Sequence, residues 1–285
     1  MTVIKSFPVM INLMADRESI CSRWKEERSK HPSFGEGKGH EDVQRMWDDA
    51  ASTYNDSQYS EISDKIVTTL LNKGIIDKDS TILDIGCGTG SFALRFSPYV
   101  SKIIGTDSSP KMLEKMMGIA SKMDIHNIEP VLSDCLSIPS DIVCDVAFSS
   151  LCPPMNDPDA LTSMESHSTG YCVYVSSANI GHGIEGEIWK ELGCDYSYSG
   201  YDTTYPYEYL RSIGKDVSLE FFTRHNHTVI KKDECVDRYF RLVGKYRRIT
   251  EHEIDVIGSI IDSHTVDGSV DLSRDMRMGM IVWTP

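Results

Sequence analysis

Three glycines follow an apolar run that contains an acid, in the segment ILDIGCGTGSF at residues 82–92. The glycines are Gly86, Gly88 and Gly90, and Asp84 stands two positions ahead of the first. A turn from a strand into a helix uses glycine where the backbone takes a positive φ or where a ligand passes close to it. The first N–H groups of the helix then point toward that ligand. The segment predicts a ligand-binding loop, and a plain tight turn is the alternative.

A second acid favours a nucleoside as the ligand. Asp107 lies 21 residues after Gly86, at the end of the apolar run KIIGTD. An acid at the carboxyl end of the second strand can accept hydrogen bonds from both ribose hydroxyls. Together the loop and the acid predict a nucleoside-bearing ligand at the point where the strand order of the sheet reverses.

The stretch from Asp84 to Gly90, taken with Asp107, resembles motif I of the class I S-adenosylmethionine-dependent methyltransferases. A dinucleotide-binding loop would place its third glycine one position later. The resemblance covers roughly residues 45–180 and the closing strand, and beyond residue 180 the chain is similar to the small-molecule type in outline. It implies S-adenosyl-L-methionine as the cofactor and in-line transfer of its methyl group to a small molecule.

The resemblance also implies which residues hold each part of the cofactor. The loop at residues 84–90, with Cys87 included, would hold the methionyl part, and Asp84 would lie near its ammonium group. Asp107 would bind the ribose, with Ser108 beside it.

The adenine and methionyl ends have further candidates under the same resemblance. Asp134 would meet the adenine amino group, with Cys135 alongside, and Ser150 ends the fourth predicted strand. Tyr54 or Trp47, from the helix ahead of the glycines, would close over the methionyl end. Core packing explains Trp47 equally well.

Catalytic residues are not specified by the sequence. Methyl transfer mainly requires positioning of the acceptor and exclusion of water, and a base is needed only when the acceptor loses a proton early. His182, between two glycines, is a candidate base or a solvated loop residue. Cys152 is the other candidate, in SSLCPPM at residues 149–155, which faintly resembles the Pro-Pro stretch of amino-group methyltransferases of nucleic acid. Its departures from that pattern favour a simple strand end at the prolines.

Three other functions stay open. Cys152 and Cys194 could hold a thiol or metalloid acceptor, as in arsenite methyltransferases, although most scattered cysteines are packed in cores. A nicotinamide-dependent oxidoreductase would use the same ribose acid, and a non-catalytic protein could bind S-adenosylmethionine without turnover. His225 and His227 would share a strand face, but no third ligand accompanies them, so no metal site is predicted.

Charge and composition limit the partners. Lys+Arg 29 against Asp+Glu 43 give a net charge of −14, which disfavours nucleic acid and anionic membranes. The sequence contains no apolar run near the roughly 20 residues of a membrane span. Eight cysteines without a C-x-x-C pair favour reduced thiols and a cytoplasmic protein. Oligomeric state is not predicted.

Alternating apolar runs and helical segments must position these residues. They predict a three-layer, Rossmann-like α/β methyltransferase fold with a mostly parallel seven-stranded sheet, an antiparallel last strand and a helical cap. The expected strands lie at residues 81–86, 102–107, 128–134, 144–150, 171–177, 217–230 and 275–285. Helices are expected at 41–54, 60–74, 91–100, 109–123 and 158–167, with one or two more in 232–264.

Four regions are expected along the chain. A helical lid at 1–58, hinged at the glycine-rich residues 35–39, precedes a cofactor-binding core at 59–180. Residues 181–230 form a substrate-shaping insertion and a strand, and 231–285 supply the last helices and the closing strand. Six tyrosines between residues 196 and 209 suggest a substrate lid that binds by stacking and cation–π contact, or a self-packed cap.

Overall fold

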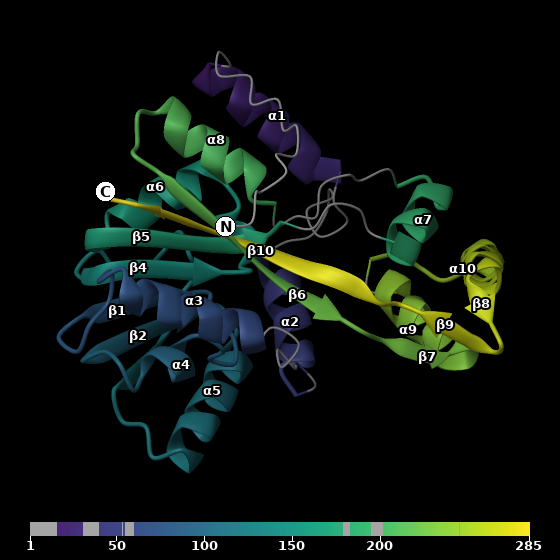
Figure 1. Cartoon of the computed structure of the whole chain (residues 1–285), viewed down its shortest axis with the longest axis horizontal. Coiled ribbons are helices and arrows are strands. Elements are labelled where there is room, and N and C mark those ends of the chain that lie inside the picture. The colour runs from purple at the N-terminus through teal and green to yellow at the C-terminus, as the bar shows by residue number, and fades with distance from the viewer. Residues whose placement is uncertain are drawn as a thin grey trace, which may run out of the picture.

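A seven-stranded sheet forms the centre of the computed structural model, which describes residues 16–30, 40–52, 54, 60–178, 183–194, 202–244 and 246–285. The strand order is β3-β2-β1-β4-β5-β10-β6 (Figure 1). Strands β1 to β5 are parallel, and β10 runs antiparallel to both of its neighbours. The strands are β1 Thr81–Ile85, β2 Lys102–Asp107, β3 Ile128–Leu132, β4 Cys144–Ser150, β5 Ser168–Ser177, β6 Ser218–Asn226 and β10 Arg274–Trp283. The predicted sheet, with its antiparallel last strand, is confirmed.

Helices cover both faces of this sheet, so its central strands are apolar on both sides. In β1, Ile82, Leu83 and Ile85 are all fully buried. Apolar residues of α3, α4 and α5 pack on one face, and those of α1, α6 and α8 pack on the other. These helices are α1 Arg17–Lys30, α3 Ser60–Asn72, α4 Ala93–Phe96, α5 Pro110–Lys122, α6 Pro158–Glu165 and α8 Thr204–Ser212. The result is the expected three-layer arrangement.

Local sequence signals set some helix ends well and others poorly. Ser109 caps α5 as predicted, because its side chain accepts a hydrogen bond from Met112 N and Pro110 takes the first helical position. The helix predicted at 91–100 is much shorter, because α4 spans only Ala93–Phe96. Because α4 is a single helical turn, the parallel strands β1 and β2 are joined by a short and largely irregular connection.

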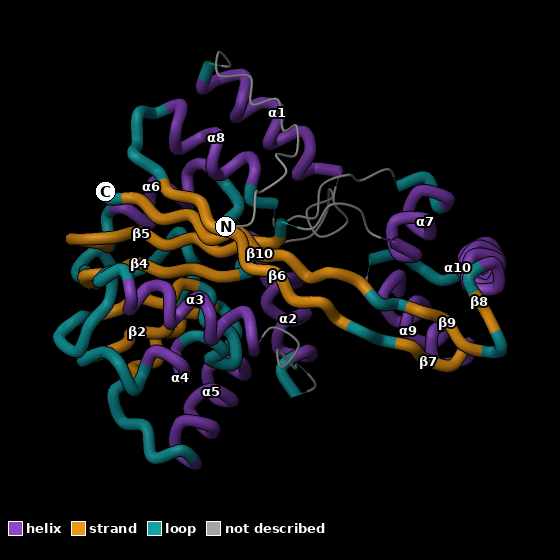
Figure 2. The backbone as a smooth tube through the Cα atoms, in the orientation of Figure 1, coloured by secondary structure: helices purple, strands orange, loops and turns teal. Residues whose placement is uncertain are grey.

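A small second lobe extends from the ends of β6 and β10 (Figure 2). Its three-stranded sheet has the order β7-β9-β8 and packs with three helices around a separate apolar cluster. The elements are α7 Gly183–Glu191, β7 Val229–Lys231, α9 Lys232–Gly244, α10 Glu251–Ser263, β8 Thr265–Val266 and β9 Ser269–Asp271. The strand predicted at 217–230 is therefore divided, because β6 ends at Asn226 and Val229 begins a strand of the other sheet.

The first described helix belongs to the core. Trp24 of α1 is fully buried, and its Nε1 donates a hydrogen bond of 2.7 Å to Asn156 Oδ1. The Trp24 ring stacks on Tyr205 of α8 at 6.3 Å between ring centroids and lies 6.0 Å from the ring of Tyr209. Arg28 also pairs with Asp157 at 2.5 Å. These contacts hold α1 against the core in this structure, and the hinge expected at 35–39 lies outside the described residues.

Candidate active site

Each glycine of the loop after β1 has a positive φ, at +70° for Gly86, +55° for Gly88 and +87° for Gly90. A Cβ atom on Gly86 would lie 2.4 Å from Cys152 Sγ, and one on Gly90 would lie 2.6 Å from Met116 Cγ. A Cβ atom on Gly88 would meet no atom within 4 Å. The first and third glycines thus permit close packing, whereas the second borders open space in which a ligand can approach the backbone.

Asp107 fixes the loop and remains able to bind a ligand. Its Oδ2 accepts a hydrogen bond of 2.9 Å from Gly88 N, and its Oδ1 accepts one of 2.9 Å from Ser109 N. Burial raises the pKa of this carboxyl group, while these N–H donors oppose the rise. Each carboxylate oxygen has a second lone pair, so both can still accept a hydrogen bond from a ribose hydroxyl.

Asp84 is a buried acid with an unsatisfied oxygen. Its side chain is 2% exposed, and its Oδ2 atom has no hydrogen-bond partner among the described residues. Burial raises the pKa of Asp84 to about 7, the N–H of Ala93 opposes this rise, and the negative charge of Asp107 adds to it. The N–H of Ala93, the first residue of α4, thus favours the ionised form of Asp84. A cationic group is a partner that would stabilise the ionised form of this buried carboxyl group.

These residues meet in one open pocket, which has about 1000 Å³ of empty space with its mouth included. The pocket lies where β1 separates β2 from β4, at the position predicted for a nucleoside. Among the residues expected to bind the cofactor, those that line it are Tyr54, Asp84, Gly86, Cys87, Gly88, Asp107, Ser108, Asp134, Cys135 and Ser150. Gly90 packs against Met116 and does not line it.

Two aromatic side chains form part of the pocket wall. Trp47 belongs to α2, which spans His40–Ala50, and Tyr54 lies shortly after that helix. Their rings meet edge to face, with 6.1 Å between the centroids and 77° between the planes. Both rings are only partly buried, so the position of Trp47 fits a ligand contact better than core packing.

Polar contacts fasten this aromatic wall to α5. Lys115 Nζ donates hydrogen bonds to Ala51 O at 2.7 Å and to Tyr54 O at 2.9 Å, so it caps the carboxyl end of α2. Asp48 accepts a hydrogen bond of 2.5 Å from Ser109 Oγ. Because Ser109 N binds Asp107, one serine joins α2 to the predicted ribose acid.

Three cysteines line the same pocket. Cys152 has Cys87 and Cys135 as companions there, whereas Cys194 packs in the apolar cluster of the second lobe. The expected pairing of Cys152 with Cys194 is therefore not supported by the geometry. Burial raises the pKa of Cys152 well above its usual range, so its thiol is protonated at neutral pH.

The histidines considered in the sequence lie elsewhere. His225 Nδ1 contacts Asp275 at 2.7 Å, His227 Nδ1 contacts Ser273 Oγ at 2.9 Å, and both contacts are exposed. No group of three potential ligands in the described part of the chain is arranged to hold a metal ion. His182 lies outside the described residues.

The tyrosine-rich segment has a packing role where the structure describes it. Tyr209 is 1% exposed, and Tyr205 and Tyr207 pack against the core cluster that contains Trp24. None of these three described tyrosines lines the pocket. This part of the predicted substrate lid is therefore a cap on the core.

Several pocket residues were not predicted from the sequence. Ser63 of α3 and Met278 of β10 come from elements far from the glycine loop in the chain. Leu151 follows β4 with a φ of +48°, which is rare for a residue other than glycine. The others are Ser91, Phe92, Met112, Ser133, Pro153 and Pro154, whereas Thr89 belongs to the predicted loop at 84–90. Ser91 and Phe92 follow the glycines, Ser133 precedes the predicted adenine acid, and the two prolines belong to the stretch at 149–155, so Met112 is the one among these others without a local signal.

Comparison with known proteins agrees with the fold and the loop. Residues 82–167 match a sequence family described as "Methyltransferase domain". The methyltransferase YcgJ of Bacillus subtilis is 37% identical over 62 residues, which cover 21% of this chain and 24% of that protein. The 23S rRNA (uracil(1939)-C(5))-methyltransferase RlmD of Chromohalobacter salexigens is 28% identical over 102 residues, or 36% of this chain and 21% of that protein. The matched part spans less than a quarter of each relative.

Solved structures extend the likeness of fold over most of the chain. A methyltransferase from Bacillus halodurans has a TM-score of 0.53 at 15% identity and covers 77% of this chain and 98% of its own. The magnesium protoporphyrin IX methyltransferase from Synechocystis PCC 6803, solved with bound SAH, has a TM-score of 0.50 at 11% identity and covers 94% and 97%.

Residues 82–167 therefore match a methyltransferase domain, and the chain shares the fold of these solved methyltransferases. Within the described part of the chain, every helix is too short or too polar to cross a membrane.

Proposed function

We propose that this protein transfers a methyl group from S-adenosyl-L-methionine to a small-molecule acceptor. The observation that carries the proposal is the unsatisfied Oδ2 of Asp84, which is buried in the wall of a pocket that also contains Asp107. A ligand that satisfies both acids has a cationic group and a ribose. S-adenosylmethionine has both groups, and the fold relative from Synechocystis was solved with SAH.

The predicted cofactor residues divide among the parts of this ligand. The loop around Gly88 and the carboxylate of Asp84 would hold the methionyl part, and Asp107 with Ser108 would hold the ribose. Asp134 and Cys135 lie beyond the end of β3, on the side of the pocket where the adenine would extend.

The chemistry requires little from individual side chains. When bound, the cofactor supplies an electrophilic methyl group on a sulfonium. Trp47 and Tyr54 would shield this centre from water, and the turn at Leu151 would set the direction from which an acceptor approaches. The protonated thiol of Cys152 is a wall of the site in this proposal and not its nucleophile.

The remaining wall of the pocket favours an acceptor with an apolar body. Leu151, Pro153, Pro154 and Met278 are apolar, and they lie outside the set assigned to the cofactor. The relative RlmD acts on rRNA, but the net charge of −14 opposes approach to a polyanion. The role of residues 181–230 in shaping the entry of the acceptor stays a prediction from the sequence, because none of the described residues in this range lines the pocket.

Methyl transfer from cofactor carrying a radiolabelled methyl group tests this function. The protein is incubated with that cofactor and with either the small-molecule fraction or the RNA fraction of a cell extract. Label should appear in a small molecule other than the cofactor, and no label should appear in RNA. Label in RNA would contradict the acceptor class, and binding of cofactor without any transfer would favour a non-catalytic protein.

A further inference from the structure

Ser63 has a buried hydroxyl that the fold does not use. It lies on α3, its side chain is 0% exposed, and its Oγ has no hydrogen-bond partner among the described residues. Ser63 also lines the pocket. Buried hydroxyl groups are nearly always hydrogen-bonded, so the Ser63 hydroxyl can donate to a ligand acceptor, since the described residues provide none.

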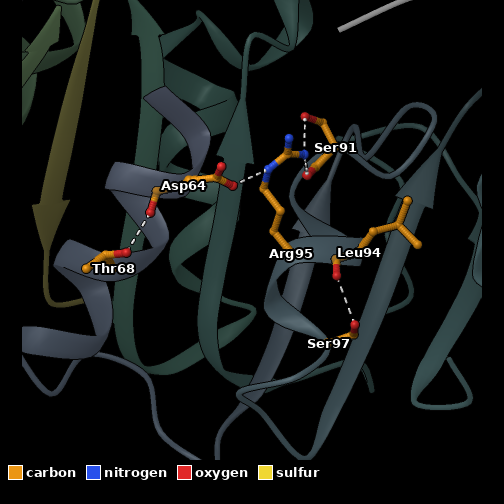
Figure 3. Close-up of polar contacts among 6 residues, drawn as sticks. All are labelled: Asp64, Thr68, Ser91, Leu94, Arg95 and Ser97. Atoms are coloured by element: carbon orange, nitrogen blue, oxygen red, sulfur yellow. Dashed lines mark hydrogen bonds and ion pairs between the residues drawn. The ribbon is translucent and has the colours of Figure 1, made fainter. Parts of the chain in front are cut away.

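The position of Ser63 identifies the end of the pocket that it faces. The next residue, Asp64, accepts a hydrogen bond of 2.8 Å from Arg95 Nε (Figure 3). Arg95 Nη1 donates in turn to Ser91 O at 2.5 Å, and it lies 3.4 Å from Ser91 Oγ. This clamp holds α3 against the segment that follows the glycines, so Ser63 lies at the methionyl end of the proposed cofactor site.

At the methionyl end of the pocket, one side carries the acid Asp84 and the other side lies near the cation Arg95. Asp84 offers an unsatisfied carboxylate oxygen, which attracts the ammonium group and repels a carboxylate. The guanidinium group of Arg95 lies behind Ser91, which also lines the pocket. No lysine or arginine is among the described residues of the pocket wall, so an anionic group there would be met by hydroxyl groups and by the backbone N–H groups of the glycine loop.

We propose that the Ser63 hydroxyl donates a hydrogen bond to the carboxylate of the methionyl part of the cofactor. Ser91, held by Arg95, is the neighbouring donor. This inference rests on the proposed function and adds to it the subsite that separates the two charged groups of an amino acid.

Replacement of Ser63 by alanine should move stability and affinity in opposite directions. In the free protein, Ser63→Ala removes a buried polar atom that has no partner, so the thermal midpoint should stay the same or rise. The same change should weaken binding of S-adenosylhomocysteine about tenfold, because a hydrogen bond to a charged group is lost. A hydroxyl with a purely structural role would not produce this combination.

A matched pair of ligands isolates the carboxylate. Calorimetry compares S-adenosylhomocysteine with its decarboxylated analogue, which keeps the adenosine, the sulfur and the amino group. Ser63→Ala should weaken the first compound about tenfold and leave the second within about twofold of the wild type. Thr68→Ala is the control, since Thr68 is exposed on α3 and its replacement should affect neither ligand.

The outcomes separate this inference from the proposed function. Equal losses for both ligands, or no loss for either, would overturn the role of Ser63 while the cofactor site remained. Failure of the wild-type protein to bind either compound would contradict the proposed function itself. Ser91→Ala provides a second variant with the same selective pattern, and an unselective effect there would count against the subsite.

Discussion

At the scale of single residues, Asp84 should make cofactor binding depend on pH. Burial raises its pKa from 3.8 to about 7, so the free protein takes up a proton there as the pH falls through 7. The ammonium group of the ligand requires the ionised form. The affinity for S-adenosylhomocysteine should therefore fall by up to about tenfold per pH unit below 7 and level off above it. Calorimetric titrations from pH 5 to pH 8 measure this slope.

The variant Asp84→Asn provides the control for that slope. The variant should bind the ligand more weakly and lose most of the pH dependence, because it lacks the carboxyl group that titrates. Any pH dependence that remains comes from Asp107, whose pKa burial also raises and which is present in both proteins.

The free wild-type protein should show the opposite trend in stability. Its folded state keeps a proton that the unfolded state releases between about pH 4 and 7, so the free energy of unfolding should fall as the pH rises through this range. An affinity that does not change with pH would contradict the assignment of Asp84.

Residues of the site could be predicted where the signal was local in sequence. Asp84, the glycines and Asp107 lie on one strand, its loop and the end of the next strand, so their spacing alone places them together. Ser63 and Met278 could not be found in this way, because only the packing of α3 and β10 brings them to the pocket. Gly90 lies outside the pocket wall, because a side chain at this position would meet Met116 of α5.

At the scale of elements, the two described helices ahead of α3 should respond differently to the loss of a tryptophan. Trp24→Ala in α1 leaves a cavity in the core and should lower the free energy of unfolding by about 3–5 kcal/mol. Trp47→Ala in α2 removes a partly buried pocket wall, so it should weaken S-adenosylhomocysteine binding with a smaller loss of stability. Urea unfolding and calorimetry measure both quantities for each variant. Equal stability losses would contradict the distinction between core helix and pocket helix.

The Lys115 contact should matter for binding because it holds α2 in place. Lys115→Met removes the cap at the carboxyl end of α2 and frees the segment that carries Trp47 and Tyr54. Affinity for S-adenosylhomocysteine should fall several-fold, and quenching of tryptophan fluorescence by the ligand should decrease. Lys111→Met, on the exposed surface of the same helix, is the matched control. If the two variants bind equally well, the proposed anchoring of α2 is wrong.

The role of α1 was beyond the reach of its sequence pattern. The helix is highly polar, and its packing depends on Ile20 and Trp24, which are four residues apart and therefore lie on one face. A narrow apolar stripe of this kind predicts a surface helix as well as a docked one. The buried hydrogen bond from Trp24 to Asn156 spans 132 residues of sequence, so no local signal could reveal it.

At the scale of the whole molecule, the sheet was predictable and the second lobe was not. Alternation of apolar runs with helices specifies a parallel sheet covered on both faces, and a final strand without a preceding crossover helix specifies an antiparallel last strand. The lobe depends on pairing between β7 and β9, which are separated in the chain by α9, α10 and β8. Such pairing follows from tertiary packing. In sequence, the short strand β7 resembles the end of the longer strand predicted at 217–230.

Titration with S-adenosylhomocysteine most directly tests whether the pocket at the carboxyl edge of the sheet holds S-adenosylmethionine. The wild-type protein should bind one equivalent, and Asp107→Asn should lose about 2–4 kcal/mol of binding free energy, because two charge-assisted hydrogen bonds to the ribose are weakened. Glu114→Gln, on the exposed side of α5, should bind as the wild type does, and NAD titrated in parallel should give no binding heat. Preference for NAD, or an affinity for S-adenosylhomocysteine that Asp107→Asn leaves unchanged, would contradict this account.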